Sequence, residues 1–134
     1  MYLLSFLGFL RYKKGTDLSQ APILVYGYGS YGIIIDAAFG TSILPLLNRG
    51  FIFAVANIRG GSEMGRHWYE DGKILNKLNT FYDFIDATKS LIHQGYGNSE
   101  KVFAMGGSAG GLLMGAVINM EPELYTGIIS AVPF

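Results

Sequence analysis

The sequence contains no cysteine and has no net charge, and each absence excludes a class of protein. Without cysteine the chain cannot form disulfides, which favours a reducing compartment, and we predict a cytoplasmic location. The 10 Lys and Arg residues are matched by 10 Asp and Glu residues. A strongly basic surface is therefore not expected, and we predict no nucleic-acid partner.

No hydrophobic run is long enough to cross a membrane. Residues 1–10 are almost all apolar, but a transmembrane helix needs about 20 apolar residues. A secretory signal would carry its positive charge before the apolar run, whereas Arg11, Lys13 and Lys14 follow it. We predict no membrane association, and we treat residues 1–10 as an atypical N-terminal segment, either a strand or an arbitrary start.

Charged residues are scarce: they make up 15% of the 134 residues, whereas hydrophobic residues make up 50%. A chain of this length forms at most one small domain, and small domains have much surface to cover. This apolar composition predicts strands that are buried on both faces of a sheet. It also predicts that the domain packs against further protein.

Apolar runs alternate with helical patterns along the chain. The expected strands are 22–28, 51–56, 101–105 and 128–132, and the expected helices are 39–48, 76–94 and 109–119. A long glycine-rich loop is expected over 57–72. Strands without polar alternation, separated by helices, indicate an α/β fold with a mostly parallel sheet.

The segment Gly106–Gly111, with the sequence GGSAGG, joins an expected strand to an expected helix. G-x-S-x-G in that setting is the signature of a nucleophile elbow, a sharp turn that exposes a reactive serine. Gly106 and Gly110 supply the side-chain-free positions that the turn needs, and Ser108 is the candidate catalytic nucleophile. The backbone N–H of Ala109, at the helix start, would favour a developing negative charge. The alternative is an ordinary Gly/Ser loop.

A second glycine motif, Gly27–Gly32, satisfies the G-x-G-x-x-G fingerprint of dinucleotide-binding proteins. That fingerprint requires a helix directly after it and an acidic residue about 20 residues further on. Residues 33–36, IIID, make a poor helix start, and no acidic residue lies between Asp36 and Glu63. Dinucleotide binding is therefore the weaker interpretation of this segment.

Four segments together, residues 26–32, 56–65, 80–86 and 106–115, resemble the catalytic α/β-hydrolase domain of the prolyl oligopeptidase family, most of all its oligopeptidase B branch. They are YGYGSYG, ANIRGGSEMG, TFYDFID and GGSAGGLLMG, in family order and at family spacing. The resemblance extends over residues 11–134. It implies the N-terminal part of that domain, truncated before the family's catalytic Asp and His.

The resemblance implies a role for several residues. Ser108 matches the family nucleophile, and Ala109 matches the residue whose backbone N–H forms half of the oxyanion hole. Tyr28 matches the tyrosine whose hydroxyl forms the other half, and Tyr31 matches an aromatic residue near the substrate pocket. Arg59 lies in a family segment, where we expect it to brace a loop.

A base is missing after the candidate nucleophile. An α/β-hydrolase places its triad in the order Ser, Asp, His, but the residues after Ser108 include neither Asp nor His. His67 and His93 both precede the serine, so chain order argues against either as the base. Asp83 and Asp86 lie on an expected helix before the elbow, where a solvated or bracing role is expected.

By this resemblance we predict a serine-type oligopeptidase, a hydrolase that cleaves short peptides after basic residues through an acyl-enzyme on Ser108. No metal or cofactor is expected. The chain alone is expected to be inactive, and a complementary chain is one source of the missing Asp and His. The alternatives are a non-catalytic remnant, one half of a split enzyme and, less favoured, a dinucleotide-binding module.

Overall fold

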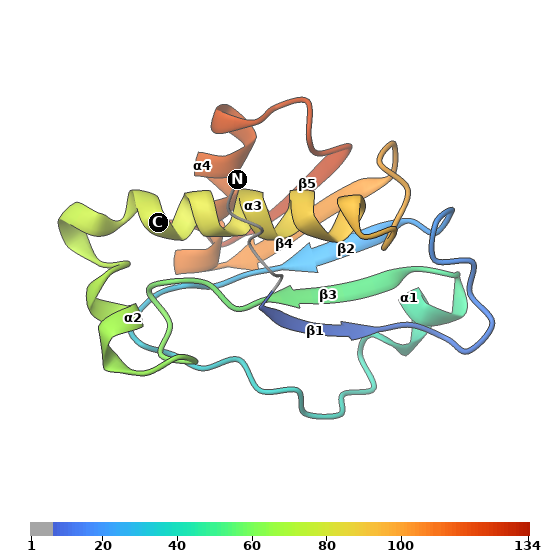
Figure 1. Ribbon diagram of the computed structural model, residues 1–134, viewed down its shortest axis with the longest axis horizontal. Coiled ribbons are helices and arrows are strands. Elements are labelled where there is room, and N and C mark those ends of the chain that lie inside the picture. The colour runs from blue at the N-terminus through green and yellow to red at the C-terminus, as the bar shows by residue number, and fades with distance from the viewer. Residues whose placement is uncertain (1–6) are drawn as a thin grey trace.

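The computed structural model describes residues 7–134, which form a five-stranded sheet with helices packed on it (Figure 1). The strands are β1 (Gly8–Arg11), β2 (Ile23–Tyr26), β3 (Ile52–Ala56), β4 (Val102–Gly107) and β5 (Gly127–Ala131). The helices are α1 (Leu44–Asn48), α2 (Arg66–Glu70), α3 (Leu78–His93) and α4 (Ala109–Met120), with a 3-10 helix, η1, at Ile74–Asn76.

The strand order is β1-β3-β2-β4-β5, and every neighbouring pair is parallel except β1 with β3. β2 lies at the centre, where Ile23 pairs with Ile52 of β3 on one side and with Val102 of β4 on the other. All three side chains are fully buried. Apolar runs without polar alternation are typical of such buried parallel strands, and the predicted mostly parallel α/β fold is confirmed.

Helices α3 and α4 lie on the same face of the sheet and contact each other. Gly27, directly after β2, touches both: a Cβ atom there would lie 2.6 Å from the Phe84 ring of α3 and 3.0 Å from Leu113 of α4. Phe84 and Leu113 are fully buried in the same core as the central strands. The two helices therefore enclose the carboxyl end of β2, where the loop 27–32 begins.

Three local predictions need correction. The expected helix 39–48 is reduced to α1, because Pro45 occupies its first turn, where the missing N–H of proline is tolerated. The expected loop 57–72 contains α2, a helix of one turn that is too short for an apolar periodicity. β4 extends to Gly107, two residues beyond its predicted end.

The N-terminal segment is in part a strand. β1 pairs antiparallel with β3, from Gly8 opposite Ala56 to Arg11 opposite Phe53, and the Arg11 guanidinium donates to the Ala38 carbonyl. The strand expected within residues 1–10 is thereby confirmed from Gly8 onward, and residues 1–6 lie outside the described part of the chain. Of the helices in residues 7–134, none is both long and apolar enough to cross a membrane.

β5 forms the other edge of the described sheet and pairs only with β4. Apolar side chains near this edge are exposed, namely Ile129, Val132 and Phe134 with exposed fractions of 53%, 81% and 66%. An open strand edge with apolar neighbours is a place for further pairing or for aggregation. We therefore predict that the chain is poorly soluble by itself.

Replacing Phe84 with alanine is expected to lower the free energy of unfolding by about 3–5 kcal/mol, because the change leaves a cavity under α3. Urea unfolding of the 134-residue chain, followed by circular dichroism, measures the loss. Tyr82, on the same helix and 50% exposed, is the matched control, and Tyr82→Ala should change the free energy by less than about 0.5 kcal/mol. Equal losses in the two variants would contradict the described packing of α3.

Candidate active site

Ser108 lies at the junction of β4 and α4, at the carboxyl edge of the sheet. Its φ and ψ are 55° and −116°, a backbone conformation that residues with a side chain rarely adopt. The serine is exposed, although Gly106, two residues before it, and Ala109, directly after it, are buried. Backbone strain that persists at an exposed polar residue is typical of functional sites. The structure thus contains the sharp turn, with the serine at its tip, that the motif predicts.

Gly106 and Gly110 allow this turn because backbone packs directly against backbone there. A Cβ atom on Gly106 would overlap the carbonyl group of Gly110, and one on Gly110 would lie 2.7 Å from the carbonyl oxygen of Gly27. The end of β4, the first turn of α4 and the end of β2 therefore meet with no side chain between them. Both glycines lie where the motif requires them, and their importance for catalysis stays a prediction.

The first turn of α4 presents backbone N–H groups beside Ser108. The N–H groups of Gly111 and Leu112 donate to the Ser108 carbonyl, at 2.9 and 3.2 Å. Ala109 comes before them, among the first N–H groups of a helix, which have no partner within the helix. The N-terminus of a helix also carries a partial positive charge. An oxygen that gained negative charge next to Ser108 would therefore be stabilised by the Ala109 N–H.

Tyr28 lies at the same edge of the sheet as Ser108, because β2 and β4 are parallel neighbours. Tyr26 of β2 pairs with Met105 of β4, so both strands end at the same level. The Tyr28 ring lies beside the first turn of α4, since a Cβ atom on Gly110 would be 3.6 Å from its Cδ2 atom. The structure thus brings Tyr28 next to the turn that carries Ser108, and the role of its hydroxyl as an oxyanion donor stays a prediction.

Tyr31 is 68% exposed, with a φ of 56°. It lines a cleft of about 280 Å³, named here the Tyr31 cleft, together with Ser30, Lys77, Ala109, Leu112 and Phe134. Ala109 connects this cleft to the N-terminus of α4. Tyr31 therefore shares a cleft with Ala109, the residue after Ser108, and its contact with a substrate stays a prediction.

The loop 27–32 does not have the structure of a dinucleotide-binding turn. Residues 33–40, directly after it, form no helix. The loop packs against the chain instead: Gly29 touches the side chains of Thr80 and Ile58, and the Gly32 N–H donates to the Gly60 carbonyl at 2.9 Å. Because the fingerprint depends on a helix N-terminus to hold phosphate groups, the structure argues against a dinucleotide-binding module.

Asp83 of α3 holds Arg59 through three hydrogen bonds. It accepts from the Arg59 backbone N–H at 3.0 Å, from Nε at 2.8 Å and from Nη2 at 2.7 Å. The hydrogen bond to Asp83 raises the pKa of the Arg59 guanidinium. The Thr80 hydroxyl, nearby on α3, donates to the Arg59 carbonyl at 2.7 Å. These contacts agree with the bracing role expected for Arg59 and Asp83.

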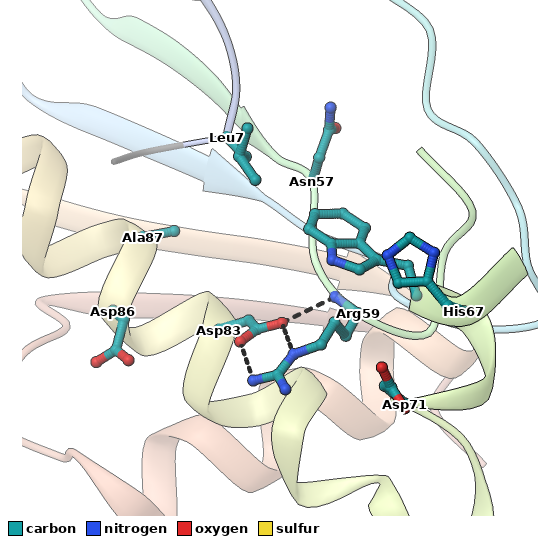
Figure 2. Close-up of a pocket in the computed structure, with 9 residues that line it drawn as sticks. Leu7, Asn57, Arg59, His67, Asp71, Asp83, Asp86 and Ala87 are labelled. Carbon is teal, nitrogen blue, oxygen red and sulfur yellow. Dashed lines mark hydrogen bonds and ion pairs between the residues drawn. The ribbon is translucent and has the colours of Figure 1, made fainter. Parts of the chain in front are cut away.

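A larger cavity of about 460 Å³ lies beside this pair, and Figure 2 shows the Asp83 carboxylate directed at Arg59. His67 of α2, Asp71 after α2 and Asp86 of α3 also line it. His67 therefore lines a cavity that holds three carboxylates and an arginine beside Leu7, Trp68 and Ala87, and this cavity is distinct from the Tyr31 cleft.

Neither histidine lines the Tyr31 cleft. His93 is the last residue of α3, whereas Lys77, just before the same helix, lines the cleft. A helix of 16 residues is about 24 Å long, so His93 lies far from the cleft. Within residues 7–134, no group of three His, Asp or Glu side chains is arranged to hold a metal ion. The described residues therefore place an exposed serine at a helix N-terminus, with no histidine in the adjoining cleft.

Lys77 is a residue of this region that sequence reasoning missed. Its Nζ donates to the Gly29 carbonyl at 2.6 Å and to the Ser30 hydroxyl at 2.8 Å. Burial lowers the pKa of the Lys77 ammonium to about 8. No motif marks this lysine, because its partners lie 47 and 48 residues earlier in the chain. The only signal available was its position at the start of the helix predicted over residues 76–94.

The chain is similar to known peptidases. A model of the prolyl oligopeptidase family matches residues 37–134. Dipeptidyl aminopeptidase BI of Pseudoxanthomonas mexicana is 58% identical over 126 residues, which cover 93% of this chain and 17% of that protein. Protease 2 of Moraxella lacunata is 58% identical over 124 residues, 92% of this chain and 18% of that protein. The chain thus spans less than a fifth of the length of these relatives.

Solved structures agree with this similarity. Oligopeptidase B from Trypanosoma brucei, with covalently bound antipain, superposes with a TM-score of 0.89 at 49% identity. The superposition covers 93% of this chain and 18% of that structure. The described fold is therefore that of the corresponding part of an α/β-hydrolase.

Gly106→Ala is expected to lower the free energy of unfolding by about 1–3 kcal/mol, because the added methyl group forces Gly110 and α4 away from β4. Gly115, in the middle of α4, is the matched control, since a Cβ atom there meets nothing within 4 Å. Gly115→Ala should raise the free energy by up to about 1 kcal/mol. Urea unfolding of the 134-residue chain measures the free energy of unfolding of both variants. A Gly106→Ala variant that is as stable as Gly115→Ala would contradict the close contact between Gly106 and Gly110.

Proposed function

The chain belongs to the prolyl oligopeptidase family, and we propose that residues 11–134 form the N-terminal, nucleophile-bearing part of a serine peptidase domain. The observation that carries this proposal is the exposed Ser108, with a φ of 55°, at the tip of β4. Closely packed glycines on both sides of the serine and a helix N-terminus behind it support the proposal. A serine in an ordinary loop does not require a strained backbone, closely packed glycines or a helix N-terminus behind it.

The proposed reaction proceeds through an acyl-enzyme. Ser108 Oγ attacks the carbonyl carbon of a peptide bond, and its proton passes to a general base. The carbonyl oxygen takes up the negative charge and accepts hydrogen bonds from the Ala109 N–H and the Tyr28 hydroxyl. The C–N bond then breaks, the amine leaves with the proton from the base, and an ester on Ser108 remains. Water attacks this ester, which releases the acid and restores the serine.

We assign the general base and its orienting acid to residues outside these 134. The Tyr31 cleft has no histidine in its lining, and Asp83 is already bound by Arg59. In α/β-hydrolases the acid and the histidine follow the serine along the chain. They would reach Ser108 either from a continuation of the polypeptide or from a second chain.

Short peptides that are cleaved after arginine or lysine are the proposed substrates. The support is similarity to proteins named protease 2 and oligopeptidase B. The Tyr31 cleft contributes no recognition of a basic side chain, because Lys73 and Lys77 line it and no Asp or Glu does. We therefore place the acidic residues that would recognise the basic side chain outside these 134 residues as well.

One half of a split enzyme is a second candidate. The open edge of β5 and the exposed Val132 and Phe134 favour it, because they present a strand edge and apolar surface to a partner chain. A non-catalytic remnant would share these features, so only a gain of activity on addition of the missing part distinguishes the two.

A chimera tests the roles of Ser108 and Tyr28. Residues 11–134 replace the matching segment of the Pseudoxanthomonas mexicana relative, which supplies the rest of the protein. With a substrate of that relative, Ser108→Ala should abolish turnover. Tyr28→Phe should lower kcat about 10²–10³-fold, the usual effect of losing one oxyanion donor.

Tyr26→Phe is the matched control in this chimera, because Tyr26 is a half-buried residue of β2 near Tyr28. Its kcat should stay within about twofold of the parent chimera. A Ser108→Ala chimera that retains turnover would contradict the proposal. Equal kcat values for Tyr28→Phe and Tyr26→Phe would contradict the assignment of Tyr28.

The 134-residue chain by itself is expected not to hydrolyse peptides, because no general base reaches Ser108. Release of p-nitroaniline from arginyl and prolyl peptide anilides measures this, with Ser108→Ala as the blank. Adding the remaining segments of the Pseudoxanthomonas mexicana relative, produced separately, should restore turnover if the chain acts as half of a split enzyme. Turnover by the chain alone that Ser108→Ala abolishes would contradict the assignment of the base to another segment.

A further inference from the structure

The loop 27–32 carries Tyr28 without regular secondary structure to hold it. Gly29, Tyr31 and Gly32 have φ values of 66°, 56° and 65°, in a region that most residues avoid. Before Tyr28 the backbone is fixed, because the Gly27 N–H donates to the β4 residue Met105 at 3.2 Å. The orientation of the Tyr28 ring therefore depends on what holds the backbone after it.

Lys77 holds the backbone after Tyr28. Its Nζ donates to the carbonyl oxygen of Gly29, the next residue, at 2.6 Å, and to the hydroxyl of Ser30 at 2.8 Å. The same Gly29 carbonyl lies so close to Gly60 that a Cβ atom on Gly60 would overlap it. The direction of this carbonyl is thus set by contact with Gly60 on one side and by the Lys77 ammonium on the other.

The start of α3 gives Lys77 a fixed position. The Lys77 N–H donates to the Ile74 carbonyl at 3.2 Å, and its carbonyl accepts from the Thr80 N–H at 3.1 Å. The hydroxyl of the fully buried Thr80 shares its one proton between the carbonyls of Arg59, at 2.7 Å, and Gly72, at 3.1 Å. Groups held on a rigid element of this kind set the geometry of a site better than groups on a free loop.

An ammonium group is unfavourable at this half-buried position. Burial lowers the pKa of Lys77 to about 8, and the four ion pairs found among residues 7–134 do not include it. Burying a charge without an opposite charge lowers stability, whereas an apolar side chain of similar length would fill the same space without that effect. What the ammonium adds is the pair of hydrogen bonds to the loop.

We propose that Lys77 is a positioning residue that orients the Tyr28 hydroxyl toward the oxyanion formed at Ser108, acting through the Gly29 carbonyl. The proposal rests on the proposed function. An oxyanion donor has to lie within about 3 Å of the charged oxygen, and a displacement of about 1 Å can lower a rate about 10²-fold. Release of the Gly29 carbonyl would permit a displacement of this kind.

Direct contact with the substrate is the competing explanation, because Lys77 also lines the Tyr31 cleft. An ammonium has three donors, and the loop uses two of them. A direct contact made equally in the bound substrate and the transition state changes KM and leaves kcat unchanged. A residue that positions an oxyanion donor changes kcat, because the oxyanion exists only after the serine has attacked.

The test uses Lys77→Met in the chimera, which removes the donors and keeps a long apolar side chain. We expect kcat to fall by about 10-fold or more, with KM within about twofold of the parent. Lys89→Met is the matched control: Lys89 lies on α3, the helix that Lys77 precedes, is exposed and pairs with Glu121 at 2.7 Å. Its kcat should stay within about twofold of the parent.

A double-mutant cycle with Tyr28→Phe identifies the group through which Lys77 acts. In the Tyr28→Phe background, Lys77→Met should lower kcat by less than about twofold further, because the hydroxyl that it positions is already missing. An unchanged kcat, a rise in KM alone, or the same loss in both backgrounds would overturn the proposal. If Tyr28→Phe alone leaves kcat unchanged, the proposed function is wrong in its assignment of Tyr28.

Elution volume and near-ultraviolet circular dichroism show whether each variant folds. If Lys77→Met does not fold, Lys77→Gln replaces it in the same cycle, because the glutamine side chain is polar but one bond shorter, so its amide cannot keep the 2.6 Å contact with the Gly29 carbonyl. We expect Lys77→Gln to lower kcat in the parent chimera and to have little further effect in the Tyr28→Phe background. A Lys77→Gln chimera with unchanged kcat, or with equal losses in both backgrounds, would overturn the proposal in the same way.

Discussion

Backbone contact between Gly110 and its neighbours Gly27 and Gly106 is the constraint on which the candidate site depends. Neither contact leaves room for a Cβ atom. Gly27 directly precedes Tyr28, and Gly110 directly follows Ala109, so the same packing places the phenol, the helical N–H and the serine in one rigid frame. A side chain at Gly110 would push α4 away from the end of β2, and one at Gly106 would push α4 away from β4, so either change would disturb the arrangement of these groups.

Helix α3 connects this frame to the rest of the protein. Lys77 just before the helix, and Thr80 and Asp83 in its first turns, each hydrogen-bond to a loop at the carboxyl edge of the sheet. Phe84 follows directly and is fully buried in the core. The polar contacts that hold the loops and the apolar contacts that hold the helix are therefore adjacent, and the core supports the site through one element.

Features that depend on a short segment were predictable from the sequence, and features that depend on distant partners were not. The strands follow from continuous apolar runs, and the turn at Ser108 follows from a motif whose constraints lie within five residues. The helix α2 has one turn and no apolar periodicity. The contacts of Lys77 form only when the start of α3 packs against the loop 27–32, which lies far earlier in the chain. No local sequence pattern predicts such a contact.

The strand order also bears on how the chain is made. β3 lies between β1 and β2, so the segment up to Ala56 contains three of the five strands described for residues 7–134. β4 then joins the free side of β2, and β5 joins the free side of β4. As the polypeptide leaves the ribosome, Ser108 is therefore synthesised after β1, β2 and β3, the three described strands on one side of β4. Each later strand extends that sheet outward without displacing an earlier one.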